Sequence, residues 1–415
     1  MILYRDYIKS MGKDIGFGKT TLNSILARLP MIGEKWYNEI PGCLFCSSKE
    51  LKTAIDFGRF PFSPGVKERP DTEHLYPFVF VLCQRCGLLQ QKYLVSPHML
   101  YPAKLVDQGV GAKWGRHYDS LAHFIQKSIL RDQKHMLDIG AAHDLVEKKL
   151  EELESGFHFT LCDPNPKDVG ERPTLRVEKK FFNEYETDEK FDIILLSHMF
   201  EHIGDHILFI GKCKSMLSEG GKIIISIPNF EIWIREGFLN AFVQEHTVYP
   251  PKDVVISFFN SLGMKADRVE LFEDHSVFFT FSVSSDAIPE KIAGELALII
   301  KKQEKDIDAY RTMLEELGIR YKAALQGRDY YMYGAHIFTQ IFLFYCGLDK
   351  ERVLGALDNS KSKRGKFLCG TNIKTFAPEE IRGKKNPVVV LNAGAYTDEI
   401  RKQLLEINPD VSIIE

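Results

Sequence analysis

Two pairs of cysteines constrain the fold of this chain more than any other feature. The pairs are Cys43-Leu-Phe-Cys46 and Cys83-Gln-Arg-Cys86, and thirty-six residues separate them. Zn²⁺ prefers four thiolates at tetrahedral corners, and each pair supplies two at the spacing of a zinc knuckle. One Cys-x-x-Cys can be a redox pair, but two in one short segment favour a metal. We therefore predict a structural Zn²⁺ held by all four cysteines, with no open position for catalysis.

The bulk properties of the chain narrow its class. A length of 415 residues predicts two or three domains. The net charge is −3 and no long basic run occurs, so we expect no nucleic-acid partner. No segment has the apolar length of a signal peptide or a membrane span, so we expect a cytoplasmic protein without membrane contact. The other four cysteines fit this compartment as buried free thiols: Cys162, Cys213, Cys346 and Cys369.

Strand-like and helical segments alternate through most of the chain. This alternation predicts an α/β fold with a doubly wound parallel sheet, followed by a smaller Rossmann-like unit. The predicted strands are 75–82 near the cysteines, 136–139, 157–161, 191–196 and 222–227 in the first sheet, and 330–333, 353–357 and 387–391 in the second. The predicted domains are an N-terminal extension (1–40), a zinc module (41–110), a cofactor domain (111–286), a helical connection (287–328) and a C-terminal domain (329–415).

The first two strands of the larger sheet end in acidic residues. Asp138-Ile-Gly140 closes the first strand, and Asp163 follows the second strand twenty-five residues later. A glycine at a strand-to-helix turn lets the backbone approach a cofactor, and a carboxylate after the second strand can accept ribose hydroxyl protons. This arrangement is typical of class I S-adenosylmethionine (SAM) enzymes, so we predict that Asp138, Gly140 and Asp163 bind SAM.

Three more residues are candidates for the same cofactor site. Ser197 and His198 end a buried strand at the carboxyl edge of the sheet, where ligands bind in such folds. Ala142 lies in the loop after Gly140. Because Ala-Ala-His-Asp follows Gly140, the chain lacks the Gly-x-Gly-x-x-Gly fingerprint of NAD sites, which favours SAM over NAD.

Two histidines are candidates for the catalytic machinery. His246 follows Glu245, and a carboxylate beside an imidazole can tune a general base. His202 is predicted at the carboxyl edge of the sheet, where it could polarise or protonate a substrate oxygen. A structural role is the alternative for any single histidine. These two are singled out because one follows a glutamate next to the cofactor domain and the other is predicted at the carboxyl edge of the sheet.

The order of these motifs resembles the sugar C-methyltransferases of deoxysugar biosynthesis. The resemblance covers about residues 41–410. It rests on Cys83-Gln-Arg-Cys-Gly-Leu-Leu-Gln90 after the first cysteine pair, on Phe200-Glu-His-Ile203, on Glu245-His246, and on a C-terminal part with Tyr333-Gly-Ala335 and Leu357-Asp-Asn-Ser360.

The resemblance implies a reaction and a substrate. The family transfers a methyl group from SAM to the carbon next to a keto group of a nucleotide-linked sugar. The resemblance then implies that His246 is the base that removes the acidic proton, with Glu245 and His202 beside it. The nucleotide-linked sugar would lie between the middle and C-terminal domains. The oligomeric state is left open.

The chain also departs from the family pattern. Val243-Gln244 replaces Tyr-His before the Glu-His pair, and Ala142-His-Asp144 replaces Asn-Asp-Gly in the cofactor loop. Lys104–Gln108 replaces a Tyr-rich stretch, Phe338-Thr339 replaces Lys-Gly, and Asp274-His-Ser276 replaces Gly-Gly-Ser. Three alternatives therefore stay open: an O- or N-methyltransferase on a related sugar, a non-catalytic sugar-nucleotide-binding member, and an NAD-dependent sugar-nucleotide enzyme.

Overall fold

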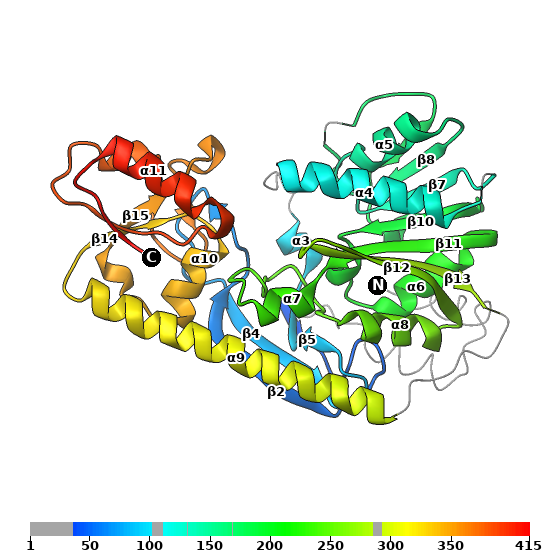
Figure 1. The fold of residues 1–415 in the computed structure, drawn as a ribbon, viewed down its shortest axis with the longest axis horizontal. Helices are drawn as coiled ribbons and strands as arrows, with labels where there is room; N and C mark the ends of the chain where they lie inside the picture. Colours follow the sequence, from blue (N-terminus) through cyan, green and yellow to red (C-terminus); the bar gives the residue numbers. More distant parts are fainter. Residues whose placement is uncertain (1–35, 102–110, 131, 168, 285–292) are drawn as a thin grey trace.

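A long helix joins two α/β units in the structure. The structure is a computed structural model that describes residues 36–101, 111–130, 132–167, 169–284 and 293–415. The larger sheet and the smaller C-terminal sheet stand at the two ends of helix α9, and the strands of the cysteine-bearing segment lie between them (Figure 1).

The larger sheet has seven strands in the order β12-β13-β11-β10-β7-β8-β9. Strands β7 to β11 run parallel, with the first strand in the centre, so the predicted doubly wound sheet is confirmed. The strands are β7 His135–Ile139, β8 His158–Cys162, β9 Leu175–Glu178, β10 Phe191–Ser197, β11 Leu217–Pro228, β12 Met264–Phe272 and β13 Ser276–Val283.

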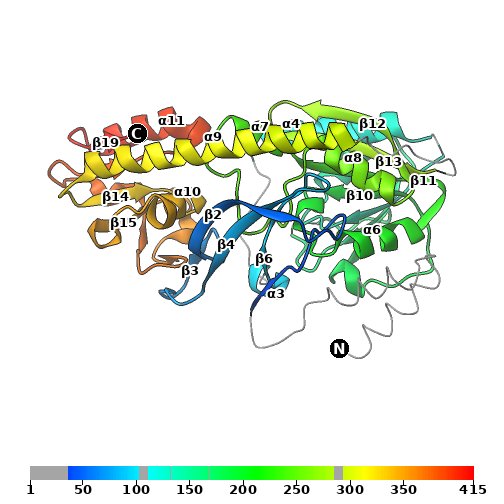
Figure 2. The same ribbon diagram turned by 90° about the horizontal axis from the view of Figure 1, so that it is seen from below.

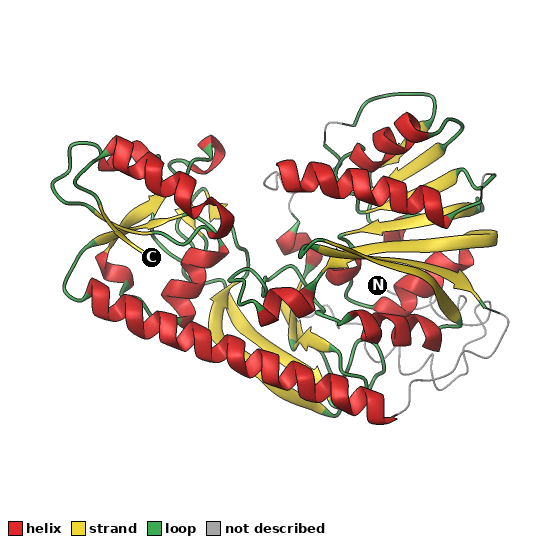
Figure 3. Ribbon diagram, viewed as in Figure 1, coloured by secondary structure: helices red, strands yellow, loops and turns green. Residues whose placement is uncertain are grey.

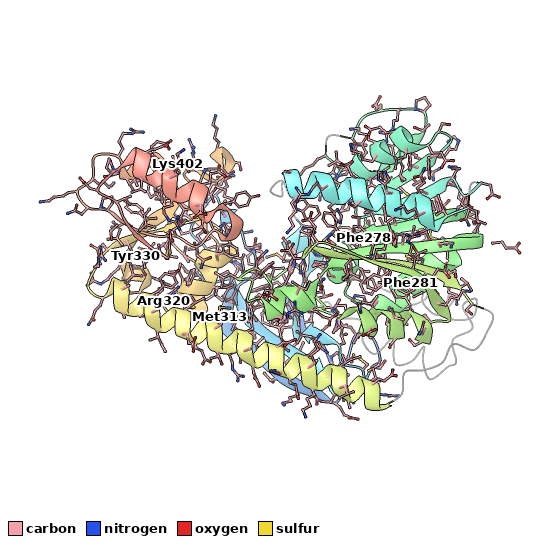
Figure 4. The ribbon with its side chains drawn as sticks, in the orientation of Figure 1. Phe278, Phe281, Met313, Arg320, Tyr330 and Lys402 are labelled. Carbon is pink, nitrogen blue, oxygen red and sulfur yellow. The ribbon has the colours of Figure 1, made fainter. Side chains whose placement is uncertain are left out.

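Helices cover both faces of this sheet (Figure 3). Apolar residues of α4 and α5 pack on one face, and those of α6 and α8 pack on the other. Strand β13 contributes to both layers because successive side chains point to opposite faces: Phe278 packs toward α4 and Phe281 toward α8 (Figure 4). The helices are α4 Ala112–Ser128, α5 Leu145–Leu153, α6 His206–Ser215, α7 Phe230–Arg235 and α8 Lys252–Ser261.

Two features of the sheet differ from a purely parallel arrangement. Strand β13 pairs antiparallel with β11, and β12 returns beside it as a hairpin. Gly220 and Gly221 lie inside β11, where the pairing with β10 shifts register, rather than in a turn before the strand. A Cβ on Gly221 would lie 2.9 Å from the Phe191 carbonyl oxygen, so this bulge requires glycine.

The cysteine-bearing segment builds a small antiparallel sheet in the order β2-β4-β5. Phe57, Phe60, Phe78 and Phe80 point from β2 and β4 into one aromatic core. The elements are β1 Tyr37–Glu39, β2 Leu51–Pro61, β3 Val66–Lys67, β4 Leu75–Cys83, β5 Leu89–Gln91, β6 Tyr93–Val95 and α3 Pro97–Leu100.

Helix α9, Ala293–Leu325, runs along β2 and β4 and reaches the C-terminal sheet (Figure 2). That sheet is parallel, in the order β17-β15-β14-β18-β19, so the Rossmann-like C-terminal unit is confirmed. Its elements are β14 Tyr330–Tyr333, α10 Ile337–Gln340, β15 Val353–Leu357, β17 Thr375–Phe376, β18 Val388–Val390, α11 Thr397–Ile407 and β19 Ser412–Ile414, while β16 Phe367–Leu368 pairs with β3.

One hydrophobic core crosses from the cysteine-bearing segment through α9 into the C-terminal sheet. It includes Phe80 of β4, Tyr249, Tyr310 of α9 and Met332 of β14, all of them fully buried. Because these residues pack together, β2 and β4 are held against both larger units. Among the described residues, no helix is long and apolar enough to cross a bilayer.

Candidate active site

The carboxyl edge of the larger sheet brings together the loops that follow β7, β8 and β10. Gly140 follows β7 with a φ of 78°, a conformation that favours glycine. A Cβ at this position would lie 2.8 Å from Met199 Sδ, so glycine also allows the loop after β10 to approach. Two backbone hydrogen bonds join the loops after β7 and β8. Gly140 N donates to the Cys162 carbonyl oxygen, and Lys167 N donates to the carbonyl oxygen of the exposed Ala142.

Acidic side chains line this edge as the sequence predicts. Asp163 is half-buried after β8, and burial raises its pKa. Asp138 is 2% exposed, and its Oδ1 has no hydrogen-bond partner among the described residues. Burial, followed by the neighbouring Glu147, raises the pKa of Asp138. The edge therefore offers an accessible carboxylate and an unsatisfied acceptor, which suit the hydroxyl and ammonium groups of a nucleoside amino acid.

Ser197 and His198 lie half-buried at the end of β10. His198 has a φ of 50°, in the left-handed region that few non-glycine residues adopt. Its Nδ1 lies 3.3 Å from Glu201 Oε1, and its Nε2 lies 3.0 Å from Ser276 Oγ. Both ring nitrogens of His198 therefore contact side chains of the protein, namely those of Glu201 and Ser276.

A cluster of Glu201, His202 and His246 forms beside this edge. One nitrogen or carboxylate oxygen of each residue lies within 4.8 Å of those of the other two. The rings of His202 and His246 meet at 4.8 Å between centroids. His246 is half-buried, and its Nδ1 has no hydrogen-bond partner among the described residues. Burial, followed by the charge of His202, lowers the pKa of His246 to about 3, so this imidazole is neutral at pH 7.

Glu201 supplies negative charge to the cluster. Its side chain is fully buried. Burial alone would raise its pKa, but the hydrogen bond from His198, followed by the neighbouring imidazoles, lowers it to about 2. Glu201 is therefore a carboxylate that can stabilise an imidazolium at His246.

Tyr101 and Glu245 hold His202 in place. The Tyr101 hydroxyl lies 2.7 Å from His202 Nδ1, and the Glu245 carbonyl oxygen lies 3.1 Å from the same atom. Because Nδ1 is engaged, Nε2 is the nitrogen that His202 can offer to a substrate oxygen. The side chain of Glu245 is buried.

The four predicted cysteine ligands form one cluster. Their sulfur atoms all lie within 4.8 Å of one another, with 3.5 Å between the Sγ atoms of Cys43 and Cys86 and 3.6 Å between those of Cys46 and Cys83. Zn–S bonds of about 2.3 Å place sulfur atoms about 3.8 Å apart at tetrahedral corners, so the cluster fits Zn²⁺ closely. All eight cysteines are free thiols.

Comparisons with known proteins find the same order of modules along the chain. Residues 43–101 match a family described as "Putative zinc binding domain", residues 114–264 match "Methyltransferase domain", and residues 296–411 match "C-methyltransferase C-terminal domain". The chain is 22% identical to the C-methyltransferase NovU of Streptomyces niveus over 417 residues, which cover 88% of this chain and 93% of NovU. The chain therefore carries the modules of a C-methyltransferase in the order in which these family models match. It is a methyltransferase with a zinc module, and its larger sheet has the class I SAM methyltransferase fold.

Two other similarities each cover less than half of this chain. The ubiquinone biosynthesis O-methyltransferase of Bradyrhizobium sp. (strain ORS 278) is 29% identical over 103 residues, which span 23% of this chain and 40% of that protein. The structure of a 1,6-didemethyltoxoflavin N1-methyltransferase of Burkholderia thailandensis with bound S-adenosylhomocysteine covers 41% of this chain and 78% of its own, at 13% identity and a TM-score of 0.31.

The zinc module of this C-methyltransferase supports the loop that carries His246. Gln91, at the end of β5, donates its side-chain amide to the carbonyl oxygens of Gln244 (2.9 Å) and His246 (2.6 Å). The backbone of β5 adds hydrogen bonds from Gln91 N to Thr247 O and from Tyr249 N to Leu89 O. Because β5 follows the second cysteine pair directly, the metal cluster and the candidate base share one short scaffold.

Gln244 joins three parts of the C-methyltransferase. Its amide donates to the Pro61 carbonyl oxygen of β2 and to Gln340 Oε1 of α10, at 3.0 and 3.1 Å. Gln340 in turn donates to the carbonyl oxygens of Ser63 and Cys369. The glutamine that replaces a family histidine is therefore a buried link between the zinc module and the C-terminal sheet.

Sequence reasoning missed three residues of the C-methyltransferase site. Tyr101 and Gln91 gave no signal, because their partners lie more than a hundred positions away. Glu201 follows Ser197 and His198 at the end of a predicted strand, and this place could have identified it as a site residue. The prediction that Lys104–Gln108 replaces a Tyr-rich stretch falls outside the described residues, as do residues 1–35 of the predicted extension.

We expect a measurable acid sensitivity from His206, which packs against Phe45 of the first cysteine pair. His206 is fully buried, it donates from Nε2 to the Phe200 carbonyl oxygen, and the negative charge of Glu201 acts on it. Burial lowers its pKa to about 3. Because the unfolded chain binds a proton here at about pH 6.5 and the folded chain does not, the free energy of unfolding decreases as pH falls below that value.

The variant His206→Gln should lose about 2 kcal/mol less of its unfolding free energy than the wild type between about pH 7 and about pH 5. Urea unfolding at both pH values measures this difference. His158→Gln, at an exposed histidine at the start of β8, should follow the wild type. Equal losses in His206→Gln and the wild type would contradict a neutral His206.

Proposed function

We propose that this protein transfers a methyl group from SAM to the carbon next to a keto group of a nucleotide-linked sugar. The observation that carries the proposal is the cluster of Tyr101, Glu201, His202 and His246 at the carboxyl edge of the larger sheet. It combines a neutral imidazole, a buried carboxylate and a polar pair, which are the groups that proton removal next to a ketone requires.

The edge of the sheet fits SAM through its own residues. Asp163 would accept hydrogen bonds from the ribose hydroxyls, and the unsatisfied Asp138 Oδ1 would accept one from the ammonium group. Gly140 would let the backbone approach the cofactor. Ala142, Ser197 and His198 would line the same site. When bound, SAM supplies an electrophilic methyl group to a nucleophilic carbon.

The chain's residues would perform the proton transfer and stabilise the charge. His246 would take the acidic proton, and Glu201 would stabilise the imidazolium that forms. His202, held through Nδ1 by Tyr101 and the Glu245 carbonyl, would direct Nε2 at the developing enolate oxygen. Donors placed against developing negative charge usually contribute the largest part of catalysis.

The C-terminal sheet would hold the nucleotide. At the carboxyl end of β14, Gly334 turns the chain with a φ of 94°, and Ala335 N donates to Asp358 Oδ2 at 2.9 Å. Lys363 pairs with the same carboxylate and lies beside the edge where ligands of such sheets bind. The four-cysteine cluster would hold a structural Zn²⁺, and the free buried thiols support a cytoplasmic location.

Calorimetric titration with SAM and S-adenosylhomocysteine tests the cofactor. A methyl-transfer assay with ¹³C-methyl SAM and a nucleotide-linked keto-hexose tests the reaction. We expect micromolar cofactor binding and a new methyl signal on carbon in the product NMR spectrum. A methyl signal on oxygen or nitrogen would overturn C-methylation, and binding of NADH without binding of SAM would overturn methyl transfer altogether.

Gly140→Ala should weaken SAM binding by about tenfold or more. The new methyl group adds left-handed strain of about 1 kcal/mol and also presses on Met199, which displaces the loop after β10. Gly156→Ala is a matched control, because Gly156 has a φ of 91° and no atom lies within 4 Å of the position that its Cβ would take. Calorimetry should find wild-type SAM affinity in Gly156→Ala; equal affinities in the two variants would remove Gly140 from the cofactor site.

A further inference from the structure

Three histidines from three separate elements meet beside the proposed active site. His117 comes from α4, His198 from the turn after β10, and His275 from the turn between β12 and β13. One ring nitrogen of each lies within 4.8 Å of those of the other two. We propose that His117, His198 and His275 bind a second cation of the borderline transition-metal class, such as Zn²⁺, separate from the cysteine cluster.

The spacing of the rings suits such a cation. The three centroid distances are 5.0 Å (His117–His198), 5.5 Å (His117–His275) and 5.5 Å (His198–His275). Around a tetrahedral ion with metal–nitrogen bonds of about 2.1 Å, imidazole centroids lie about 5 Å apart. Trp114 packs edge to face against all three rings and restricts their rotation.

Polar partners on the outer side orient two of the rings. His117 Nε2 lies 3.0 Å from Ser226 Oγ, which leaves Nδ1 as the other ring nitrogen. This Nδ1 belongs to a fully buried side chain and has no hydrogen-bond partner among the described residues. His198 Nδ1 faces the Glu201 carboxylate at 3.3 Å. Metal-binding histidines commonly donate their second N–H to a carboxylate or another acceptor in this way.

Two ring nitrogens of the cluster meet at one hydroxyl. His198 Nε2 and His275 Nδ1 both approach Ser276 Oγ, at 3.0 and 2.6 Å. A hydroxyl can donate to one imidazole nitrogen and accept from the N–H of another, so these contacts hold the two rings beside the same oxygen. Neutral imidazoles suit Zn²⁺, Fe²⁺, Co²⁺ or Ni²⁺ rather than Mg²⁺ or Ca²⁺.

The position of the cation gives it a role that rests on the proposed function. Three protein ligands leave a coordination position for water or another oxygen. The site lies at the carboxyl edge of the sheet, and the 3.3 Å contact between His198 Nδ1 and Glu201 Oε1 connects it with the cluster around His246. We therefore assign the open position to an oxygen of the methyl acceptor.

Cobalt titration of the zinc-loaded full-length protein tests the site. We expect one Co²⁺ per chain beyond the cysteine-bound zinc, with visible absorption bands of nitrogen- and oxygen-bound cobalt and no thiolate charge-transfer band. His275→Asn and His117→Asn should each weaken Co²⁺ binding by about tenfold or more. His123→Asn, at an exposed histidine of the same helix α4, should bind as the wild type does.

The outcomes decide the proposal without reference to turnover. A wild-type protein that takes up no Co²⁺ beyond its zinc would overturn it, and so would wild-type affinity in His275→Asn. The wild-type titration needs no variant, so misfolding of the buried His117→Asn cannot obscure the result. Because the measurement is metal uptake, it can succeed or fail independently of methyl transfer.

Discussion

Replacing His246 by asparagine should lower the rate of methyl transfer by about 10²- to 10⁴-fold, the usual contribution of a general base. The dissociation constant of SAM should stay within about twofold of the wild-type value, because His246 belongs to the cluster of Glu201 and His202 and not to the loops after β7 and β8. Single-turnover kinetics with calorimetry separates the two quantities. His135→Asn, at the amino end of β7, provides a histidine control at the opposite edge of the sheet.

The pH dependence gives a second check on the same residue. A base works in its deprotonated form, and the pKa of His246 is lowered to about 3 by burial and by His202. The rate should therefore persist as pH falls through 6.5, the ordinary value for histidine, until the protein itself unfolds. A rate that halves near that ordinary value, or a His246→Asn variant with wild-type turnover, would contradict the assignment.

Cys83→Ser should release the zinc and destabilise the whole chain. Zinc binding in structural sites contributes about 10–16 kcal/mol, as much as the entire stability of a typical domain. The Cys83 sulfur lies 3.6 Å from that of Cys46 and within 4.8 Å of the other two, so its loss removes one of the four corners of the site. Elemental analysis should find no zinc in the variant, and thermal melting should begin at a much lower temperature.

A buried thiol outside the cluster provides the matched control for this variant. Cys213 in α6 is as deeply buried as Cys83, so Cys213→Ser should keep one zinc per chain and lose only the packing of one sulfur atom. Full zinc content in Cys83→Ser would show that the four sulfur atoms do not form the metal site.

Local sequence patterns predicted the central strands of both parallel sheets. The predicted strands at 136–139 and 191–196 correspond to β7 and β10, because continuous apolar runs are typical of buried parallel strands. The antiparallel pairing of β13 with β11 was not predicted, since pairing direction depends on a partner far away in the chain. The boundaries of the five predicted domains stay predictions.

The candidate site was only partly accessible to the same reasoning. Acidic residues and histidines at strand ends could be placed, because the carboxyl ends of parallel strands meet at one edge. The contact of Tyr101 with His202 and the support of the His246 loop by Gln91 come from tertiary packing. Sequence paired His246 with Glu245, which stays a prediction, and the structure adds the Glu201 carboxylate within 4.8 Å of the imidazole.

The core shared by the cysteine-bearing segment, α9 and the C-terminal sheet determines how the chain can be divided. Phe80, Tyr249 and Tyr310 belong to three separate stretches of sequence, yet they share one buried core. The ring of Phe80 packs against Tyr249, and the ring of Tyr310 packs against Phe242. A fragment cut at the limits of one family match would expose an aromatic surface that water does not reach in the intact chain. We therefore expect that modules recognised separately in the sequence do not fold separately in this chain.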